Sequence, residues 1–188
     1  AGADVVVFEP TEAFAAASKK RITASLDRAV EKGKLAAADR DAALARLRFT
    51  TDLKDLADRQ LVIEAIVEDE NVKAKVFAQL DEIITDPDAV LASNTSSIPI
   101  MKIAAATKNP SRVIGLHFFN PVPVLPLVEL VSTLVTAPEA AARVERFAAA
   151  GLGKQVVRCG DRSGFVVNAL LVPYLLAAIR MAEAGVAT

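Results

Sequence analysis

The order in which strand-like and helix-like segments follow one another constrains this chain most. Short apolar runs alternate with longer segments in which apolar residues recur at helical spacing. This alternation predicts a parallel sheet with helices on both faces, that is, a doubly wound, Rossmann-like α/β domain. The expected strands cover residues 4–9, 61–67, 89–93, 113–119, 125–131 and 155–159, and the expected helices residues 11–34, 37–47, 71–84, 100–106 and 138–151.

A change of pattern marks a second part of the chain. Residues 160–164 read Gly, Asp, Arg, Ser and Gly, which interrupts the periodicity and indicates a domain boundary. Residues 1–160 are therefore expected to form the α/β domain, and residues 161–188 to begin an all-helical second domain. One long helix is expected over residues 165–184. Because apolar residues cover nearly its whole circumference, we expect it to be buried against further helices.

Composition excludes several classes of protein. With 53% hydrophobic and 24% charged residues, the chain has the composition of a folded globular protein. A net charge of −1, without a basic stripe interleaved with aromatic residues, argues against nucleic acid as a partner. No uninterrupted apolar run reaches the roughly 18 residues of a membrane span. The single cysteine, Cys159, excludes an internal disulfide and fits a reducing compartment. We therefore expect a cytoplasmic protein, and an organellar protein whose targeting segment is already absent is the alternative.

His117, the only histidine, and Glu129, which stands inside an apolar run, are the first candidates for chemistry. If residues 113–119 and 125–131 are strands, the proline-rich segment between them must reverse the chain, because proline is excluded from central ladder positions. A return centred near Pro123 sets residue 117 opposite residue 129. A buried carboxylate needs a partner, and the imidazole is the nearest candidate. The pair would be a general base and its orienting group; a core histidine beside a solvent-facing glutamate is the alternative that spacing leaves open.

A strand that ends in an acid stands near the start of the chain. Residues 5–8 are apolar and Glu9 follows them, as at the end of the second strand of a dinucleotide-binding unit. A carboxylate there binds the adenosine ribose hydroxyls and favours NAD over NADP. The glycine-rich phosphate-binding turn should lie about 20 residues earlier, but only eight residues precede Glu9. The first strand of the sheet and this turn are therefore expected to be missing from the sequence.

Polar residues follow the strand expected at 89–93. Residues 93–97 read Ser-Asn-Thr-Ser-Ser and would lie at the carboxyl end of the sheet, where open α/β sheets bind ligands. They could hydrogen-bond a nicotinamide, a hydroxyl or a carbonyl, and capping of the next helix is the alternative. Glu68 and Lys73 follow the preceding strand. As charges at the solvated start of a helix they need no function. An excess of basic residues over 18–34 could attract a phosphorylated ligand or form a solvated face.

Four strings of residues, taken together, strongly resemble the L-3-hydroxyacyl-CoA dehydrogenase family. The strings lie at residues 93–97, 117–123, 127–131 and 164–168, and the resemblance runs across essentially the whole chain. It implies an NAD-dependent oxidoreductase that interconverts an L-3-hydroxyacyl-CoA and a 3-ketoacyl-CoA in the β-oxidation of fatty acids. The His-Phe-Phe-Asn-Pro string that begins at His117 is its most specific part.

The resemblance also implies roles for residues that match the family's motifs. His117 would be the catalytic base and Glu129 its partner, while Ser96 and Asn168 would hold the reacting oxygen. No metal site is implied. The implied NAD contacts are Glu9, Glu68, Lys73, Ser96 and Asn120. The implied contacts to the coenzyme A substrate are Lys20 and Ser96.

The chain departs from the family pattern in ways that leave other functions open. The glycine turn and most of the helical second domain are absent, and Ala169 stands where the family usually has arginine. That domain covers the substrate and supplies the dimer contact in the family. A homodimer is therefore expected of the complete protein, and no activity of the present chain alone. The alternatives are a related β-hydroxyacid or sugar-acid dehydrogenase, or a non-catalytic remnant that has lost cofactor binding.

Overall fold

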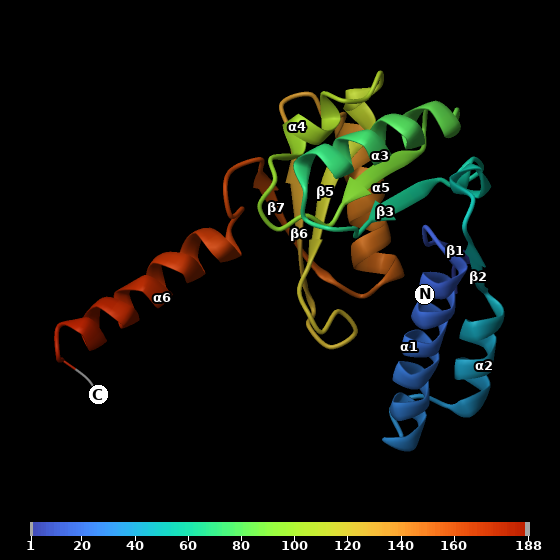
Figure 1. The fold of residues 1–188 in the computed structure, drawn as a ribbon, viewed down its shortest axis with the longest axis horizontal. Helices are drawn as coiled ribbons and strands as arrows, with labels where there is room; N and C mark the ends of the chain where they lie inside the picture. Colours follow the sequence, from blue (N-terminus) through green and yellow to red (C-terminus); the bar gives the residue numbers. More distant parts are fainter. Residues whose placement is uncertain (1, 187–188) are drawn as a thin grey trace. The chain divides into compact units, whose positions relative to one another are not determined.

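The computed structural model describes residues 2–186 and divides into two compact units, the first ending at Asp58 and the second beginning at Arg59 (Figure 1). Both units combine helices with parallel strands, which confirms the predicted α/β class. The strands form two separate sheets, one of two strands and one of five. The predicted domain boundary at residue 160 is not tested by this division and stays a prediction.

The first unit consists of two parallel strands and the two helices that connect them. β1 (Val5–Phe8) pairs along its whole length with β2 (Leu47–Thr50). Between them lie α1 (Glu12–Glu31) and α2 (Ala37–Ala45), and the short 3₁₀ helix η1 (Leu53–Leu56) follows β2. The sequence analysis missed β2 and carried the second helix to residue 47. Only four residues pair in this strand, too few for the alternation of apolar side chains to be separated from a helix end.

The second unit contains the five-stranded sheet in the order β3-β4-β5-β6-β7. β3, β4 and β5 are parallel to one another, β6 runs antiparallel to β5, and β7 is parallel to β6. All five strands were predicted, with ends that differ by up to three residues. Their bounds are β3 (Leu61–Glu64), β4 (Val90–Ser93), β5 (Val113–Phe118), β6 (Leu127–Ser132) and β7 (Gln155–Gly160).

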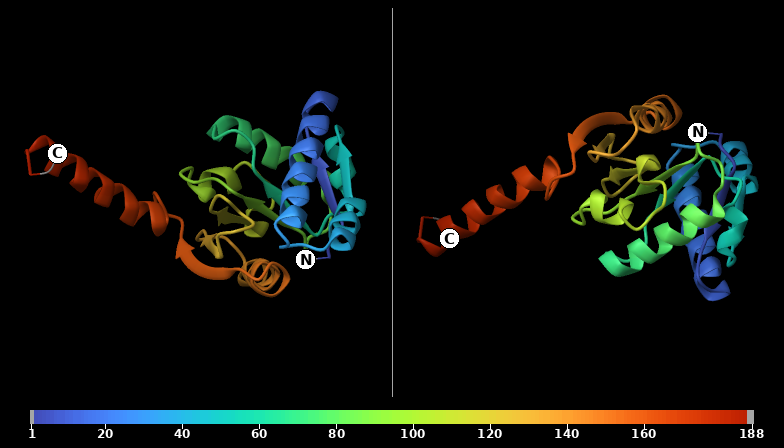
Figure 2. Two further views of the ribbon diagram at one scale, coloured as in Figure 1. Left: turned by 90° about the horizontal axis from the view of Figure 1, so that it is seen from below. Right: turned by 90° about the horizontal axis from the view of Figure 1, so that it is seen from above.

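Helices cover both faces of this sheet, as Figures 1 and 2 show. α3 and α4 lie on one face and α5 lies on the other. The helical segments are α3 (Glu70–Ile83), α4 (Ile100–Ala104), the 3₁₀ turn η2 (Pro110–Arg112), α5 (Pro138–Arg146), the π-helical turn η3 (Phe147–Gly151) and α6 (Val167–Glu183).

Alternate residues of β5 and β6 serve different faces of the sheet, because side chains along a strand alternate in direction. Leu116 and Leu130 pack into the apolar core that includes residues of α5. His117 and Glu129, one position along in each strand, therefore point to the opposite face. Gly115 is on that same face and touches α4 so closely that a β-carbon there would lie 2.9 Å from Ile100 Cδ1. The period-2 pattern thus turns the two polar side chains away from the α5 core.

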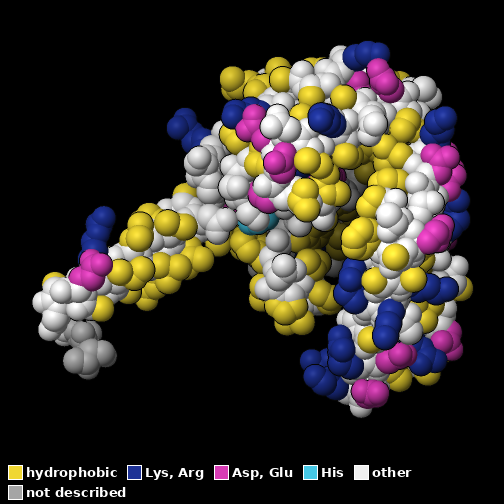
Figure 3. Space-filling model, viewed as in Figure 1, with side chains coloured by type: hydrophobic (Ala, Val, Ile, Leu, Met, Phe, Trp, Pro, Cys, Tyr) yellow, Lys and Arg dark blue, Asp and Glu magenta, His cyan; other side chains and the backbone are white. Residues whose placement is uncertain are grey.

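α6 carries many apolar side chains but has no buried residue. Leu170 and Tyr174, for example, are exposed, and Figure 3 shows hydrophobic side chains along the helix. The prediction that this helix is buried against further helices is not tested. No helix among residues 2–186 is long and apolar enough to cross a membrane.

Candidate active site

His117 and Glu129 meet as the strand spacing predicts. In the antiparallel ladder of β5 and β6, residue 117 is paired with residue 129. The imidazole Nδ1 lies 2.7 Å from Oε2 of the carboxylate. His117 is 5% exposed and Glu129 is fully buried. An ionised carboxylate only accepts hydrogen bonds, so Nδ1 is the donor, and Nε2 is the ring nitrogen on the side away from Glu129.

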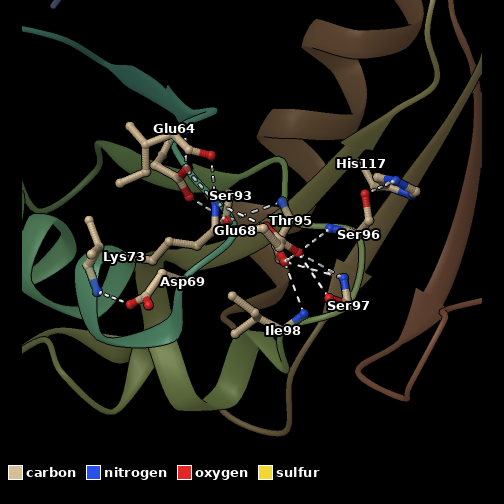
Figure 4. A network of polar contacts seen from close by, with 12 residues as sticks. Glu64, Glu68, Asp69, Lys73, Ser93, Thr95, Ser96, Ser97, Ile98 and His117 are labelled. Atoms are coloured by element: carbon tan, nitrogen blue, oxygen red, sulfur yellow. Dashed lines mark hydrogen bonds and ion pairs between the residues drawn. The ribbon is translucent and has the colours of Figure 1, made fainter.

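Ser96 lies on the other side of the imidazole ring. It belongs to the segment that follows β4, and its hydroxyl oxygen is 3.1 Å from Nε2 of His117 (Figure 4). The three side chains thus form a hydrogen-bonded line from hydroxyl to imidazole to carboxylate. Ser96 itself is exposed, so the outer end of this line is open to solvent while the inner end is closed. Nε2 of the imidazole thus faces a hydroxyl at hydrogen-bond distance, which is the geometry that a general base requires.

The second carboxylate oxygen of Glu129 is bound by backbone. The N–H groups of Val166 and Val167 donate to Oε1 at 2.9 and 2.8 Å, where α6 begins. Three donors therefore satisfy a carboxylate that is out of contact with water, which removes most of the cost of burying it. The sequence analysis missed these two donors, because a backbone N–H has no signature in the side-chain pattern.

Glu68 organises the segment that carries Ser96. Its Oε1 accepts from the backbone N–H of Ser96 at 3.0 Å and of Ser97 at 3.2 Å, and from the hydroxyl of Thr95. Burial raises the pKa of Glu68, but the hydrogen bonds from Thr95 and Ser96 and the charge of Lys73 outweigh it and lower this pKa to about 2. The carboxylate is therefore ionised at neutral pH and holds the loop by charge-assisted hydrogen bonds.

Lys73 connects the partly exposed Glu68 to a buried acid, Glu64. Its ammonium group lies 2.6 Å from Oε1 of Glu64 and 3.3 Å from Oε2 of Glu68. Glu64, at the end of β3, also accepts a hydrogen bond of 2.7 Å from the hydroxyl of Ser93 (Figure 4). The sequence analysis did not place Glu64 in the site. An acid at the end of an apolar strand, as with Glu129, is the signal that could have found it.

Asn168 and Asn120 are the other residues of the second unit that were predicted for the site. Asn168 is in the first turn of α6, and its Nδ2 is 3.5 Å from the backbone oxygen of Ser96, at the limit of a hydrogen bond. Asn120 is exposed just after β5. The rings of Phe119 and Phe165 contact the imidazole of His117, with centroids 4.6 and 5.6 Å away. Two aromatic rings thus border the base.

Glu9 and Lys20 belong to the first unit. Glu9 follows β1, where its carboxylate accepts a hydrogen bond from the hydroxyl of Ser18, which in turn accepts one of 2.7 Å from Arg21. Lys20 is exposed on α1 and lines a shallow depression with Lys19. The roles of both residues stay predictions.

The fold and the site together define an α/β domain of the dinucleotide-binding class that carries an acid–base pair. Comparison with known proteins identifies the family. Residues 1–162 match the sequence model of the "3-hydroxyacyl-CoA dehydrogenase, NAD binding domain". The chain therefore belongs to the 3-hydroxyacyl-CoA dehydrogenase family, as its motifs predicted, and the matched domain is the one that binds NAD in that family.

Individual relatives and solved structures agree with this assignment. A 3-hydroxybutyryl-CoA dehydrogenase of Mycobacterium tuberculosis is 72% identical over 188 residues, which is 100% of this chain and 66% of the relative. Human mitochondrial hydroxyacyl-coenzyme A dehydrogenase is 43% identical over 190 residues, 98% of this chain and 60% of the relative. The crystal structure of M. tuberculosis FadB2 matches with a TM-score of 0.96 and 72% identity, over 98% of this chain and 65% of that one. The chain spans about two thirds of the length of the curated relatives it matches.

Proposed function

We propose that this chain is the NAD-binding part of an enzyme that oxidises an L-3-hydroxyacyl-CoA to the 3-ketoacyl-CoA and catalyses the reverse reaction with NADH. The observation that supports this function best is the hydrogen-bonded line of Ser96, His117 and Glu129. The line provides a buried imidazole whose one nitrogen is engaged by a carboxylate and whose other nitrogen faces a hydroxyl.

Each residue of the line has a defined task in this reaction. NAD, when bound, accepts the hydride that leaves C3 of the substrate. His117 accepts the hydroxyl proton at Nε2, and Glu129 fixes the tautomer and stabilises the imidazolium that forms. A base held in this way contributes about 10²–10⁴-fold to the rate. Ser96 and Asn168 hydrogen-bond the oxygen as it changes from hydroxyl to carbonyl.

The residues present fit NAD by the chemistry of their polar groups. Glu9 supplies a carboxylate at the carboxyl end of the parallel strand β1, the position that binds ribose hydroxyls. The exposed Ser96 and Asn120 supply neutral donors and acceptors suited to a nicotinamide amide. In our proposal Glu68 and Lys73 complete the cofactor contacts. The side chain of Lys73 is only 1% exposed, so it acts on the cofactor through the carboxylates it holds.

The proposal extends to the substrate and the cellular setting of the enzyme. A short acyl group is proposed because a relative with 72% identity is named a 3-hydroxybutyryl-CoA dehydrogenase. Lys20, on the basic helix α1, is proposed to face the phosphates of coenzyme A. We further propose a role in β-oxidation in the cytoplasm. The exposed apolar side chains of α6 support packing against a helical second domain and a homodimer of the complete protein.

One set of assays tests the function. The product of the whole gene is mixed with NADH and acetoacetyl-CoA, and turnover is followed by the loss of NADH absorbance, with NADH binding measured by fluorescence. We expect NADH binding and turnover of acetoacetyl-CoA, with none of free 3-ketoacids. Turnover of the free acids alone would support a β-hydroxyacid or sugar-acid dehydrogenase instead. The absence of NADH binding would support a non-catalytic protein and contradict the proposal.

A further inference from the structure

Glu129 joins the catalytic histidine to the start of α6. One carboxylate oxygen accepts from His117, and the other accepts from the N–H groups of Val166 and Val167. Since Glu129 is fully buried, no water can replace these donors. The orientation of the carboxylate, and with it that of the imidazole, therefore depends on where the amides of Val166 and Val167, the N-cap and first residue of α6, lie.

Two consecutive residues with left-handed backbone set the position of these amides. Gly164 has φ +75° and Phe165 has φ +50°, and Phe165 is the only non-glycine residue with positive φ among the residues that the structure describes. A β-carbon at position 164 would lie 2.9 Å from the backbone nitrogen of Ala169, inside the first turn of α6. A bulky side chain in left-handed backbone is unusual and persists only where its surroundings hold it.

The packing of the Phe165 side chain keeps its backbone in this conformation. It is 7% exposed, and its ring meets the ring of His117 edge-on at a centroid distance of 5.6 Å. The same turn therefore reaches the base by two routes. The phenyl ring contacts the imidazole directly, and the two amides bind Glu129, which binds the imidazole.

We propose that the Gly164–Phe165 turn is a positioning element of the proton-transfer machinery, and that it aligns His117 by presenting two α6 amides to Glu129 and a phenyl ring to the imidazole. The inference rests on the proposed function for its catalytic meaning. Gly164 and Phe165 are positioning residues, since neither is assigned a contact with substrate or cofactor.

A matched pair of glycine variants tests the turn. Gly164→Ala places a β-carbon against the backbone of α6 and shifts its first amides. Gly185→Ala is the control, because Gly185 also has positive φ, +70°, and follows the other end of the same helix, where a β-carbon meets nothing within 4 Å. Both variants impose the same kind of backbone strain, but only the first disturbs the amides that bind Glu129.

Kinetics on the product of the whole gene give the first measurement. We expect Gly164→Ala to lower kcat by about tenfold or more, part of the contribution of a general base, while KM for NADH and the kcat of Gly185→Ala change by less than about twofold. In a Glu129→Gln background, Gly164→Ala should lower kcat by less than about twofold further, because residues that act through one group are not additive. A full additional loss in that background would overturn the claim that Gly164 acts through the amides that bind Glu129.

The spectrum of the imidazole gives a second measurement that does not need activity. His117 is the only histidine of this chain, and in protein labelled with ¹⁵N-histidine its ring signals are identified by their loss in His117→Gln. We expect the downfield Nδ1 proton of the His117–Glu129 hydrogen bond in the wild type and in Gly185→Ala, and its loss in Gly164→Ala. If the gene product proves inactive, the proposed function fails while this comparison still decides the inference.

Phe165→Leu covers the case in which Gly164→Ala does not fold. Leucine keeps apolar bulk at the same backbone position and removes the ring that meets His117. We expect a change in the ¹⁵N signals of His117 and a fall in kcat of about threefold or more, at unchanged KM for NADH. Unchanged signals and unchanged kcat in this variant would overturn the proposal.

Discussion

His117 and Glu129 stand directly opposite each other in the β5–β6 ladder and share a hydrogen bond of 2.7 Å between Nδ1 and Oε2. The backbone of the sheet therefore sets the distance between base and acid. Side chains on strands of a central sheet are held more precisely than side chains on loops, which suits a group that must meet a substrate proton within hydrogen-bond reach.

Replacing the base tests this arrangement. In the product of the whole gene, we expect His117→Gln to lower kcat by about 10²-fold or more, because the amide cannot accept the proton. NADH affinity should change little, since the imidazole is proposed to contact the substrate hydroxyl. Steady-state kinetics and NADH fluorescence measure the two quantities. Near-normal turnover would remove His117 from the role of base.

Lys73 and Glu64 allow a test of the buried network. Their side chains are 1% and 2% exposed and 2.6 Å apart. Lys73→Met leaves the Glu64 carboxylate buried without its cation, so we expect the free energy of unfolding to fall by about 3–5 kcal/mol. Lys102→Met is the matched control, because Lys102 pairs with Glu70 at 2.8 Å but both side chains are about half exposed, and its loss should be about 1 kcal/mol or less. Urea unfolding that gave equal losses for the two variants would contradict this account.

The sequence predicted the centre of the site because two local rules sufficed. Proline between the strands required a reversal, and the period of 2 along each strand then placed residue 117 opposite residue 129, as the structure confirms. The strand and helix order of the second unit was predicted for the same reason, since each element carries several apolar residues at one spacing.

The parts that the sequence did not predict depend on contacts without a side-chain pattern. The amides of Val166 and Val167 reach Glu129 from 37 and 38 residues away, and no residue type encodes a backbone donor. The pairing of Glu64 with Lys73 joins a strand end to a helix. From the sequence alone, charged residues at such positions are expected to face solvent. β2 was missed because four residues carry too little periodicity.

Glu68 predicts a dependence of stability on pH. Its pKa in the folded chain, about 2, lies below its ordinary value of 4.5. The stability that the ionised carboxylate contributes is therefore fully present above about pH 4.5 and is lost as the pH falls from there toward 2. We expect the difference in the free energy of unfolding between wild type and Glu68→Gln to be constant near neutral pH and to shrink below about pH 4.5. A difference that stayed constant down to about pH 2.5 in urea unfolding would contradict the prediction.

Cys159 offers a chemical probe of the charge on Glu129. Burial raises the pKa of the Cys159 thiol, the negative charges of Glu129 and Asp161 raise it further, and the result is about 11. Because the thiolate is the form that reacts, we expect alkylation by iodoacetamide to be slow at neutral pH and its rate to rise with pH up to about 11. Glu129→Gln removes one of the two charges and should move this rise to lower pH, whereas Glu139→Gln, an exposed acid at the start of α5, should leave it in place. An identical pH profile in the wild type and Glu129→Gln would mean that Glu129 carries no negative charge near the thiol, which would also remove its role as the partner that stabilises the imidazolium of His117.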